Sequence, residues 1–196
     1  MNQSTLEKIH ALKATRIQAE TEATPLLTSG FSIDLAPYWE QLDQLTKTSV
    51  DIWNKKPGGQ RQVTNQYNTN FTGHAAELTA FAYYQQHYTN VEAPDLTAYL
   101  NNTEETSDFD ILADDLKIQV KGISLLLSGK YQVTPYNVHE YINNSTDEIM
   151  FCYVDKINQK GYVYGRTTPQ AMLQDNNRAD NDQGKSCFSG ERVLLN

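Results

Sequence analysis

Three residues with chemically useful side chains stand in two neighbouring apolar runs of the sequence. Asp110 lies in the first run, and Gln119 and Lys121 lie in the second. Because successive side chains of a strand point to opposite faces, Gln119 and Lys121 share one face while Val120 lies on the other. A hairpin through residues 114–115 brings Asp110 across from them. A carboxylate, an amide oxygen and an ammonium group gathered in this way suit cation binding and the stabilisation of negative charge.

The apolar runs predict the strands that must position these residues. Phe109 to Ala113 and Leu116 to Lys121 flank an Asp-Asp pair, a residue type that favours a tight turn between two strands. Two later runs, Glu148 to Asp155 and Lys160 to Gly165, predict two more strands joined by a short turn around Asn158.

Helices are expected before these strands. Gly73 to Tyr88 is the clearest helix, because apolar residues recur on one of its faces, and Glu77 lies beside that face. Gln3 to Thr21 and Asp34 to Asn54 have a similar spacing and predict helices that cover the core. Lys55 to Thr72 contains proline and glycine and many polar residues, which predicts a loop.

Weaker patterns occupy the rest of the chain. Asn90 to Ala93 predicts a short extended piece, and Thr168 to Leu173 predicts a helical turn. The tail from Gln174 to Glu191 is rich in Asp, Asn, Gly and Ser, and we expect no regular structure there.

The order of these motifs resembles the PD-(D/E)XK nuclease superfamily in its Gln-x-Lys form. A helix carrying Glu77 is followed by Ser-Asp-Phe-Asp-Ile-Leu at 107–112 and by Lys-Ile-Gln-Val-Lys-Gly at 117–122. The resemblance covers roughly residues 70–165. It implies an α/β fold with a restriction-endonuclease-like core, which is a mixed central sheet flanked by helices, here with additional N-terminal helices.

The resemblance also implies a role for each site residue. Asp110 and Glu77 bind the metal ion, together with Gln119 and the backbone carbonyl of Val120, and Lys121 orients or activates the attacking water. Gln119 stands where the family usually has Asp or Glu, and a neutral oxygen binds a hard cation more weakly than a carboxylate. The implied cofactor is Mg²⁺, with Mn²⁺ able to substitute. The implied activity is that of a metal-dependent deoxyribonuclease, an endonuclease of restriction or homing type that hydrolyses phosphodiester bonds.

The chain has 196 residues, which is the usual size of one domain with appendages. We expect N-terminal helices and a loop that pack on the core at 1–69, the nuclease core at 70–175 and a polar C-terminal tail at 176–196.

The net charge of -8 argues against a protein that coats nucleic acid without specificity, because such binding depends on Lys and Arg. The charged residues are distributed unevenly along the sequence. The segment 92–115 contains only acidic charged residues, and 54–75 contains only basic ones. The acidic segment either recruits a divalent cation or is a solvated loop. Its members are Glu92, Asp95, Glu104, Glu105, Asp108, Asp110, Asp114 and Asp115.

The basic segment either follows a DNA backbone or is a solvated loop. Positive charge with interleaved Tyr suits phosphate and base contacts. The candidate DNA-binding residues are Lys55, Lys56, Arg61, Tyr67 and Lys130. The expected partner is double-stranded DNA, and a homodimer would match the two-fold symmetry of a double-strand cutter.

The sequence also gives expectations about the location of the protein in the cell. No stretch approaches the roughly 20 apolar residues that span a bilayer, and the two cysteines lack the spacing of zinc or redox motifs. We expect no membrane partner and an intracellular, cytoplasmic protein with reduced thiols.

Two other functions fit the same residues. One is a catalytically weak or inactive protein of the nuclease fold that acts as a DNA-binding or protein-binding subunit, which the acidic charge and Gln119 favour. The other is an unrelated α/β interaction module in which Asp110 and Lys121 are an exposed pair.

Overall fold

The protein is described by a computed structural model at residues 30–55, 63–92, 109–123, 130–173, 178–180 and 186–191. Six strands form a mixed sheet in the order β1-β7-β6-β4-β3-β2, in which β4 and β6 are parallel and the other neighbours are antiparallel. Their bounds are Ser32–Asp34 for β1, Val91–Glu92 for β2, Ile111–Ala113 for β3, Leu116–Ile123 for β4, Glu148–Asp155 for β6 and Lys160–Thr167 for β7.

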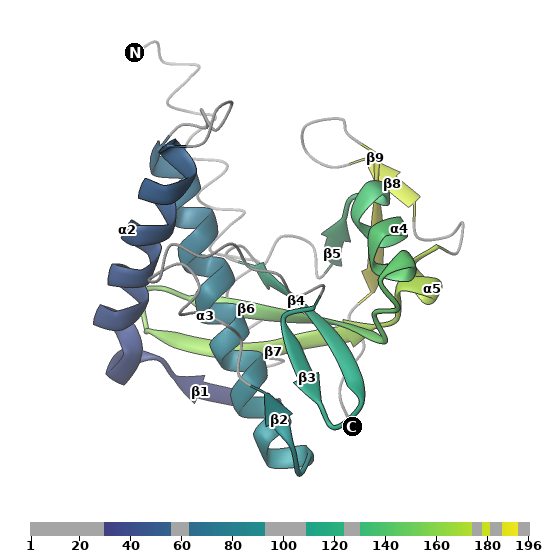
Figure 1. Ribbon diagram of the computed structural model, residues 1–196, viewed down its shortest axis with the longest axis horizontal. Helices are drawn as coiled ribbons and strands as arrows, with labels where there is room; N and C mark the ends of the chain where they lie inside the picture. Colours follow the sequence, from purple (N-terminus) through teal and green to yellow (C-terminus); the bar gives the residue numbers. More distant parts are fainter. Residues whose placement is uncertain are drawn as a thin grey trace, which may run out of the picture.

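A smaller antiparallel sheet has the order β5-β9-β8, and helices lie beside both sheets (Figure 1). These strands are β5 (Lys130–Val133), β8 (Arg178–Asp180) and β9 (Ser186–Glu191). The helices are the 3-10 helix η1 (Ala36–Tyr38), α2 (Trp39–Lys55), α3 (Val63–His87), α4 (Pro135–Asn143) and α5 (Pro169–Met172). The mixed α/β class with a mixed central sheet is therefore confirmed.

The two faces of the large sheet support two apolar clusters. Ile118 and Val120 of β4 belong to the cluster that includes residues of α2 and α3. Phe151 of β6 belongs to the cluster that includes residues of α4 and α5. Because side chains alternate along β4, Gln119 and Lys121 lie on the face toward α4, as the sequence predicts.

Two glycines let α3 cross the sheet at close range. A Cβ atom on Gly122 of β4 would lie 2.5 Å from the backbone oxygen of Thr72 on α3. A Cβ on Gly161 of β7 would lie 1.9 Å from the Thr79 hydroxyl oxygen. Real Cβ atoms essentially never come this close to another atom, so these positions require glycine. The close crossing fixes α3, and with it Glu77, against β4.

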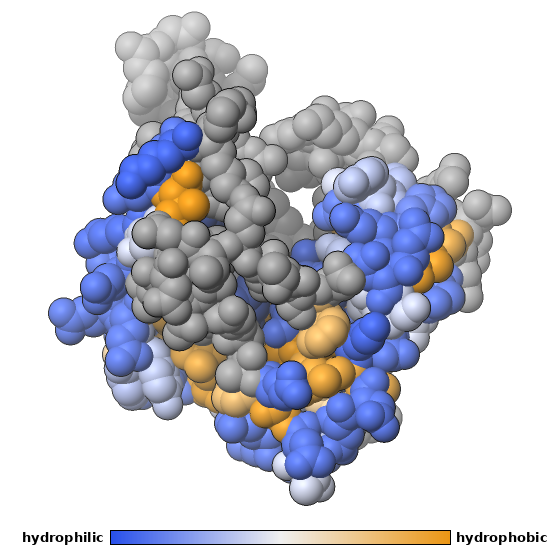
Figure 2. Space-filling model, in the orientation of Figure 1, coloured by the Kyte–Doolittle hydropathy of each residue, from blue (hydrophilic) through white to orange (hydrophobic). Residues whose placement is uncertain are grey.

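In Figure 2 apolar residues are seen below the centre of the view, where α3 and β3 lie in Figure 1, with hydrophilic residues below them and to their right. Within the described ranges, no helix is both long enough and apolar enough to cross a membrane.

Most of the expected elements are present. The hairpin with its turn at residues 114–115, the strands β6 and β7 and the helical turn α5 are confirmed. The helix expected from Asp34 to Asn54 is confirmed as α2, although Asp34 itself ends the strand β1. The expected helix at 3–21 lies outside the described residues.

Two expectations were wrong. The predicted loop Lys55 to Thr72 is helical from Val63, because Phe71 and Gln66 are buried as part of α3. The tail from Gln174 contains β8 and β9, which are held by pairing with each other and with β5 and not by an apolar pattern.

The helix α3 runs through position 69/70, at which the sequence analysis divides the N-terminal part of the chain from the core.

Candidate functional site

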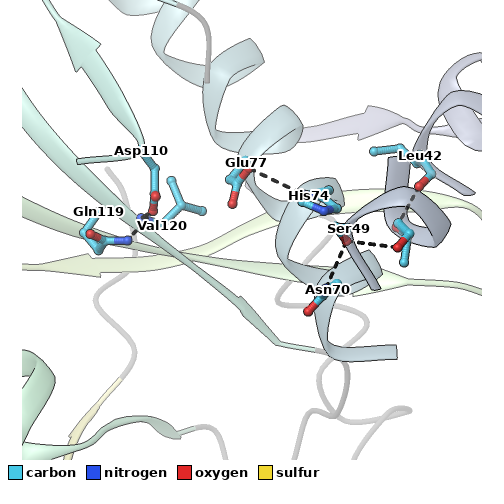
Figure 3. A network of polar contacts seen from close by, with 9 residues as sticks. Leu42, Ser49, Asn70, His74, Glu77, Asp110, Gln119 and Val120 are labelled. Atoms are coloured by element: carbon cyan, nitrogen blue, oxygen red, sulfur yellow. Dashed lines mark hydrogen bonds and ion pairs between the residues drawn. The ribbon is translucent and has the colours of Figure 1, made fainter. Parts of the chain in front are cut away.

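The candidate site forms where β3 begins beside β4. The pairing of Ile111 with Ile118 sets Asp110 opposite Gln119. The Asp110 N–H donates to the Ile118 carbonyl over 3.0 Å. Its carboxylate Oδ2 accepts from the Val120 N–H over 2.6 Å and from the Gln119 side-chain amide (Figure 3). Asp110 thus extends the pairing of β4 through its side chain.

The same edge of β4 presents a backbone oxygen. The N–H and C=O of one strand residue point to the same edge, and the Val120 N–H points to Asp110. The Val120 carbonyl is therefore directed toward the edge that carries the Asp110 carboxylate. Backbone, amide and carboxylate oxygens come together there.

Lys121 lies on the same face of β4 as Gln119 and is half-buried. Its Nζ is 5.2 Å from the centroid of the Tyr141 ring on α4. Burial raises the pKa of Tyr141, the nearby Lys121 lowers it, and the charge of Asp110 raises it. The lysine and the carboxylate are thus close enough to act on one phenol.

Sequence reasoning missed Tyr141. The available signal was the spacing of Val138 and Tyr141, three residues apart in a helix that Thr134 caps and Pro135 begins. Both side chains are buried in the cluster on the α4 face.

Glu77 approaches from the other face of the sheet. It stands on α3, with 23% of its side chain exposed, and its Oε2 lies 3.8 Å from the Nδ1 of His74. In Figure 3 Glu77 points from α3 toward Val120 and Asp110. The structure therefore brings Asp110, Gln119 and Val120 into direct contact and places Glu77 on the helix that covers Val120.

The donor chemistry of this edge fits a hard cation. Among the described residues, no three His, Cys, Asp or Glu side chains gather closely enough to hold a metal ion. The available donors are the carboxylates of Asp110 and Glu77, the Gln119 amide oxygen and the Val120 carbonyl, all of them oxygens of the kind that Mg²⁺ prefers. Gln119 directs its NH₂ group to Asp110. Its side-chain amide must therefore rotate before its oxygen can share a cation with the Asp110 carboxylate.

The structure describes the side chains of two of the candidate DNA-binding residues, Lys55 and Tyr67. Lys55 is exposed at the end of α2. The Tyr67 hydroxyl donates to Asp43, and burial followed by this contact raises the pKa of Tyr67 to about 12. Lys56 and Arg61 lie outside the described residues, as does the side chain of Lys130 on β5.

A second polar cluster, with a partly exposed arginine, lies on the α3 face. The Tyr84 hydroxyl donates to Glu148, and Arg166 Nη1 lies 3.5 Å from the other oxygen of that carboxylate. Burial raises the pKa of Glu148, while the bond from Tyr84 and the charge of Arg166 lower it. This cluster joins α3 to β6 and β7.

Comparison of the chain with protein-family models, curated proteins and solved structures finds no match. The function must therefore be argued from the residues and their geometry.

Proposed function

We propose that the protein is a Mg²⁺-dependent DNA endonuclease of the PD-(D/E)XK kind, with its active site at the β3–β4 edge. The observation that carries the proposal is the contact of Asp110 with Val120 and Gln119, with Lys121 next on the same face. An acid, an amide and a lysine that converge beside a backbone carbonyl form a set suited to metal-assisted phosphodiester hydrolysis.

The order of elements supports the same proposal. The helix α3 with Glu77 comes first, then the antiparallel strands β2, β3 and β4, and then α4 before β6, which pairs with β4 in parallel. The resemblance calls for this sequence of a helix with an acid, an extended piece, an Asp strand, a Gln-x-Lys strand and later strands. We assign the restriction-endonuclease-like core to these elements.

In the proposed mechanism, Asp110, Glu77, Gln119 and the Val120 carbonyl would hold a Mg²⁺ or Mn²⁺ ion. The chemistry that such an ion would supply there is polarisation of the phosphate and a lower pKa for a bound water. Lys121 lies on the same face of β4 as Gln119, and there its ammonium would stabilise negative charge that develops on the phosphate or would orient the water. Asp110 itself is fixed by the Val120 N–H, so its carboxylate needs little rearrangement.

Double-stranded DNA is the substrate that we propose, approached by a homodimer whose two sites act on the two strands. A chain with a net charge of -8 repels DNA as a whole, so binding must come from specific contacts. Because these contacts join Lys or Arg to phosphates, the affinity should depend on the salt concentration. Lys55 and its basic neighbours in the sequence supply the positive charge for such contacts.

A second candidate function is a DNA-binding or protein-binding subunit with a weak or inactive site. Two features of Gln119 favour it: the residue is neutral where the family usually has a carboxylate, and its NH₂ group donates a hydrogen bond to the Asp110 carboxylate. Such a protein binds DNA or a protein partner but cleaves slowly or not at all.

The two candidates are separated by incubating the chain with supercoiled, linear, single-stranded and branched DNA, with Mg²⁺ or with a chelator. A nuclease cleaves only with the metal, and Lys121→Met removes the cleavage. Lys160→Met is the matched control, because Lys160 is exposed on β7 and outside the site. Binding without cleavage in Mg²⁺ or Mn²⁺ supports the second candidate, and equal cleavage by Lys121→Met contradicts the proposed site.

A further inference from the structure

We propose that Tyr141 is a positioning residue that holds the Lys121 ammonium near Asp110. The helix α4, which carries Tyr141, would then contribute directly to the geometry of the site. The inference deepens the proposed nuclease function and rests on it for its catalytic meaning. The contact between Tyr141 and Lys121, however, can be tested whether or not the protein cleaves DNA.

The first support is the geometry of the lysine. Lys121 is a long side chain with four rotatable bonds, and an exposed lysine samples many positions. Here its Nζ lies 5.2 Å from the Tyr141 ring centroid, within range of the attraction between a cation and an aromatic ring. The charge of Lys121 also acts on the Tyr141 hydroxyl. Contact with this rigid side chain restricts the positions that the ammonium can take.

The second support is the rigidity of Tyr141 itself. Only 5% of the residue is exposed, and its ring packs in the cluster with Val138 and Phe151. Its backbone carbonyl accepts from the Thr146 N–H over 2.9 Å at the end of α4. A buried ring on a short, capped helix is a fixed point, unlike the lysine that it contacts.

The third support is the set of charges around the phenol. Lys121 from β4, Asp110 from the edge of β3 and Glu140 from α4 itself act on the Tyr141 hydroxyl. A tyrosine that served packing alone would not need a hydroxyl on which the two charged residues of the candidate site both act. Tyr162 offers a contrast, because it packs in the same cluster but only Asp155 acts on its hydroxyl.

The comparison of Tyr141→Phe with Tyr162→Phe separates positioning from packing. Each variant removes one hydroxyl from the same cluster and keeps the ring. If Tyr141 positions Lys121, Tyr141→Phe lowers kcat for cleavage by about ten- to a hundredfold and leaves KM nearly unchanged, because misplacing a catalytic group affects the reaction step. Tyr162→Phe leaves both constants unchanged.

The contact itself is measured by NMR on protein labelled with ¹³C-lysine, with the Lys121 CεH₂ signal assigned by its loss in Lys121→Arg. The nearby ring shifts this signal in the wild type. The inference predicts that Tyr141→Leu, which removes the ring, moves it toward the position of exposed lysines and that Tyr162→Leu does not. If Tyr141→Leu does not fold, the Tyr141 ring signals of wild type and Lys121→Met test the same contact. Signals that do not move overturn the inference, whereas moved signals in a protein that never cleaves DNA contradict only the proposed function.

Discussion

The Asp110 carboxylate accepts a hydrogen bond from the Val120 N–H, with 2.6 Å between the two heavy atoms. The Asp110 side chain thereby bonds to the edge of β4 just before β3 begins. In a longer β3, a backbone group would pair with β4 at this place. The same contact orients the carboxylate toward the proposed cation site. Asp110 therefore has a structural and a chemical role, and its variants must be chosen to separate them.

The structural role predicts that Asp110→Ala destabilises the protein by about 1–3 kcal/mol, because two donors, on Val120 and Gln119, lose their acceptor. From the sequence alone, removing one acidic side chain from an acidic segment is expected to leave stability unchanged or slightly higher. Urea unfolding decides between the two expectations. Asp115→Ala, in the exposed turn, is the control that should stay within about 0.5 kcal/mol of the wild type.

Gln119→Glu should destabilise the metal-free protein, because it sets a second carboxylate against Asp110 and removes the amide donor. Mg²⁺ should then restore stability by mass action, with a larger rise in Tm than in the wild type. Thermal melts with and without Mg²⁺ measure this. Gln41→Glu, exposed on α2, adds the same charge away from the site and should show no such gain. A Gln119→Glu protein that is destabilised and insensitive to Mg²⁺ removes Gln119 from the cation site.

Glu148 should make stability depend on pH in a defined direction. Its folded pKa is raised by burial above the ordinary 4.5, so the native state binds the proton more tightly than the unfolded state. The stabilisation from protonation is complete below the ordinary pKa and is lost as the pH rises through the raised pKa. The unfolding free energy of wild type minus that of Glu148→Gln should therefore increase as the pH is lowered from neutral to about 4.5. A difference that stays flat over this interval contradicts the assignment.

Gly122→Ala should destabilise the protein by about 1–3 kcal/mol, because the new methyl group meets the backbone of α3 at Thr72 and the helix must move. Gly73→Ala is the matched control on α3, since a Cβ there has nothing within 4 Å. Alanine in a helix interior should stabilise the protein by about 0.5–1 kcal/mol. Equal effects of the two substitutions on the free energy of unfolding would contradict the close crossing of α3 and β4.

The sequence predicted the elements in which apolar residues form runs or recur at a regular spacing. The β3–β4 hairpin and β6 and β7 have apolar runs bounded by turns, and their placement of Gln119 and Lys121 on one face followed from alternation. The sequence did not predict β8, β9 or the helical start of α3 at Val63. These elements depend on contacts with residues distant in the chain, such as the pairing of β9 with β5. Their polar sequences have no regular spacing of apolar residues from which to predict them.

The same distinction applies to the site. Asp110 and Gln119 could be placed together because one turn joins their strands. Tyr141 could not, since it reaches Lys121 only through the packing of α4 on the sheet, twenty residues further along the chain. The hydrogen bond from Val120 to Asp110 was also beyond sequence reasoning, because it depends on where the pairing of β3 begins.

The central claim is tested most directly by the rate at which wild type and Asp110→Asn cleave supercoiled plasmid DNA in Mg²⁺, after thermal melts show that both are folded. Asparagine keeps an oxygen that can accept from Val120 but removes the negative charge that would hold the cation. The account predicts Mg²⁺-dependent cleavage by the wild type and a loss of at least about two orders of magnitude in the variant. Equal rates for the two proteins, or no cleavage by a folded wild type in Mg²⁺ or Mn²⁺, would contradict it.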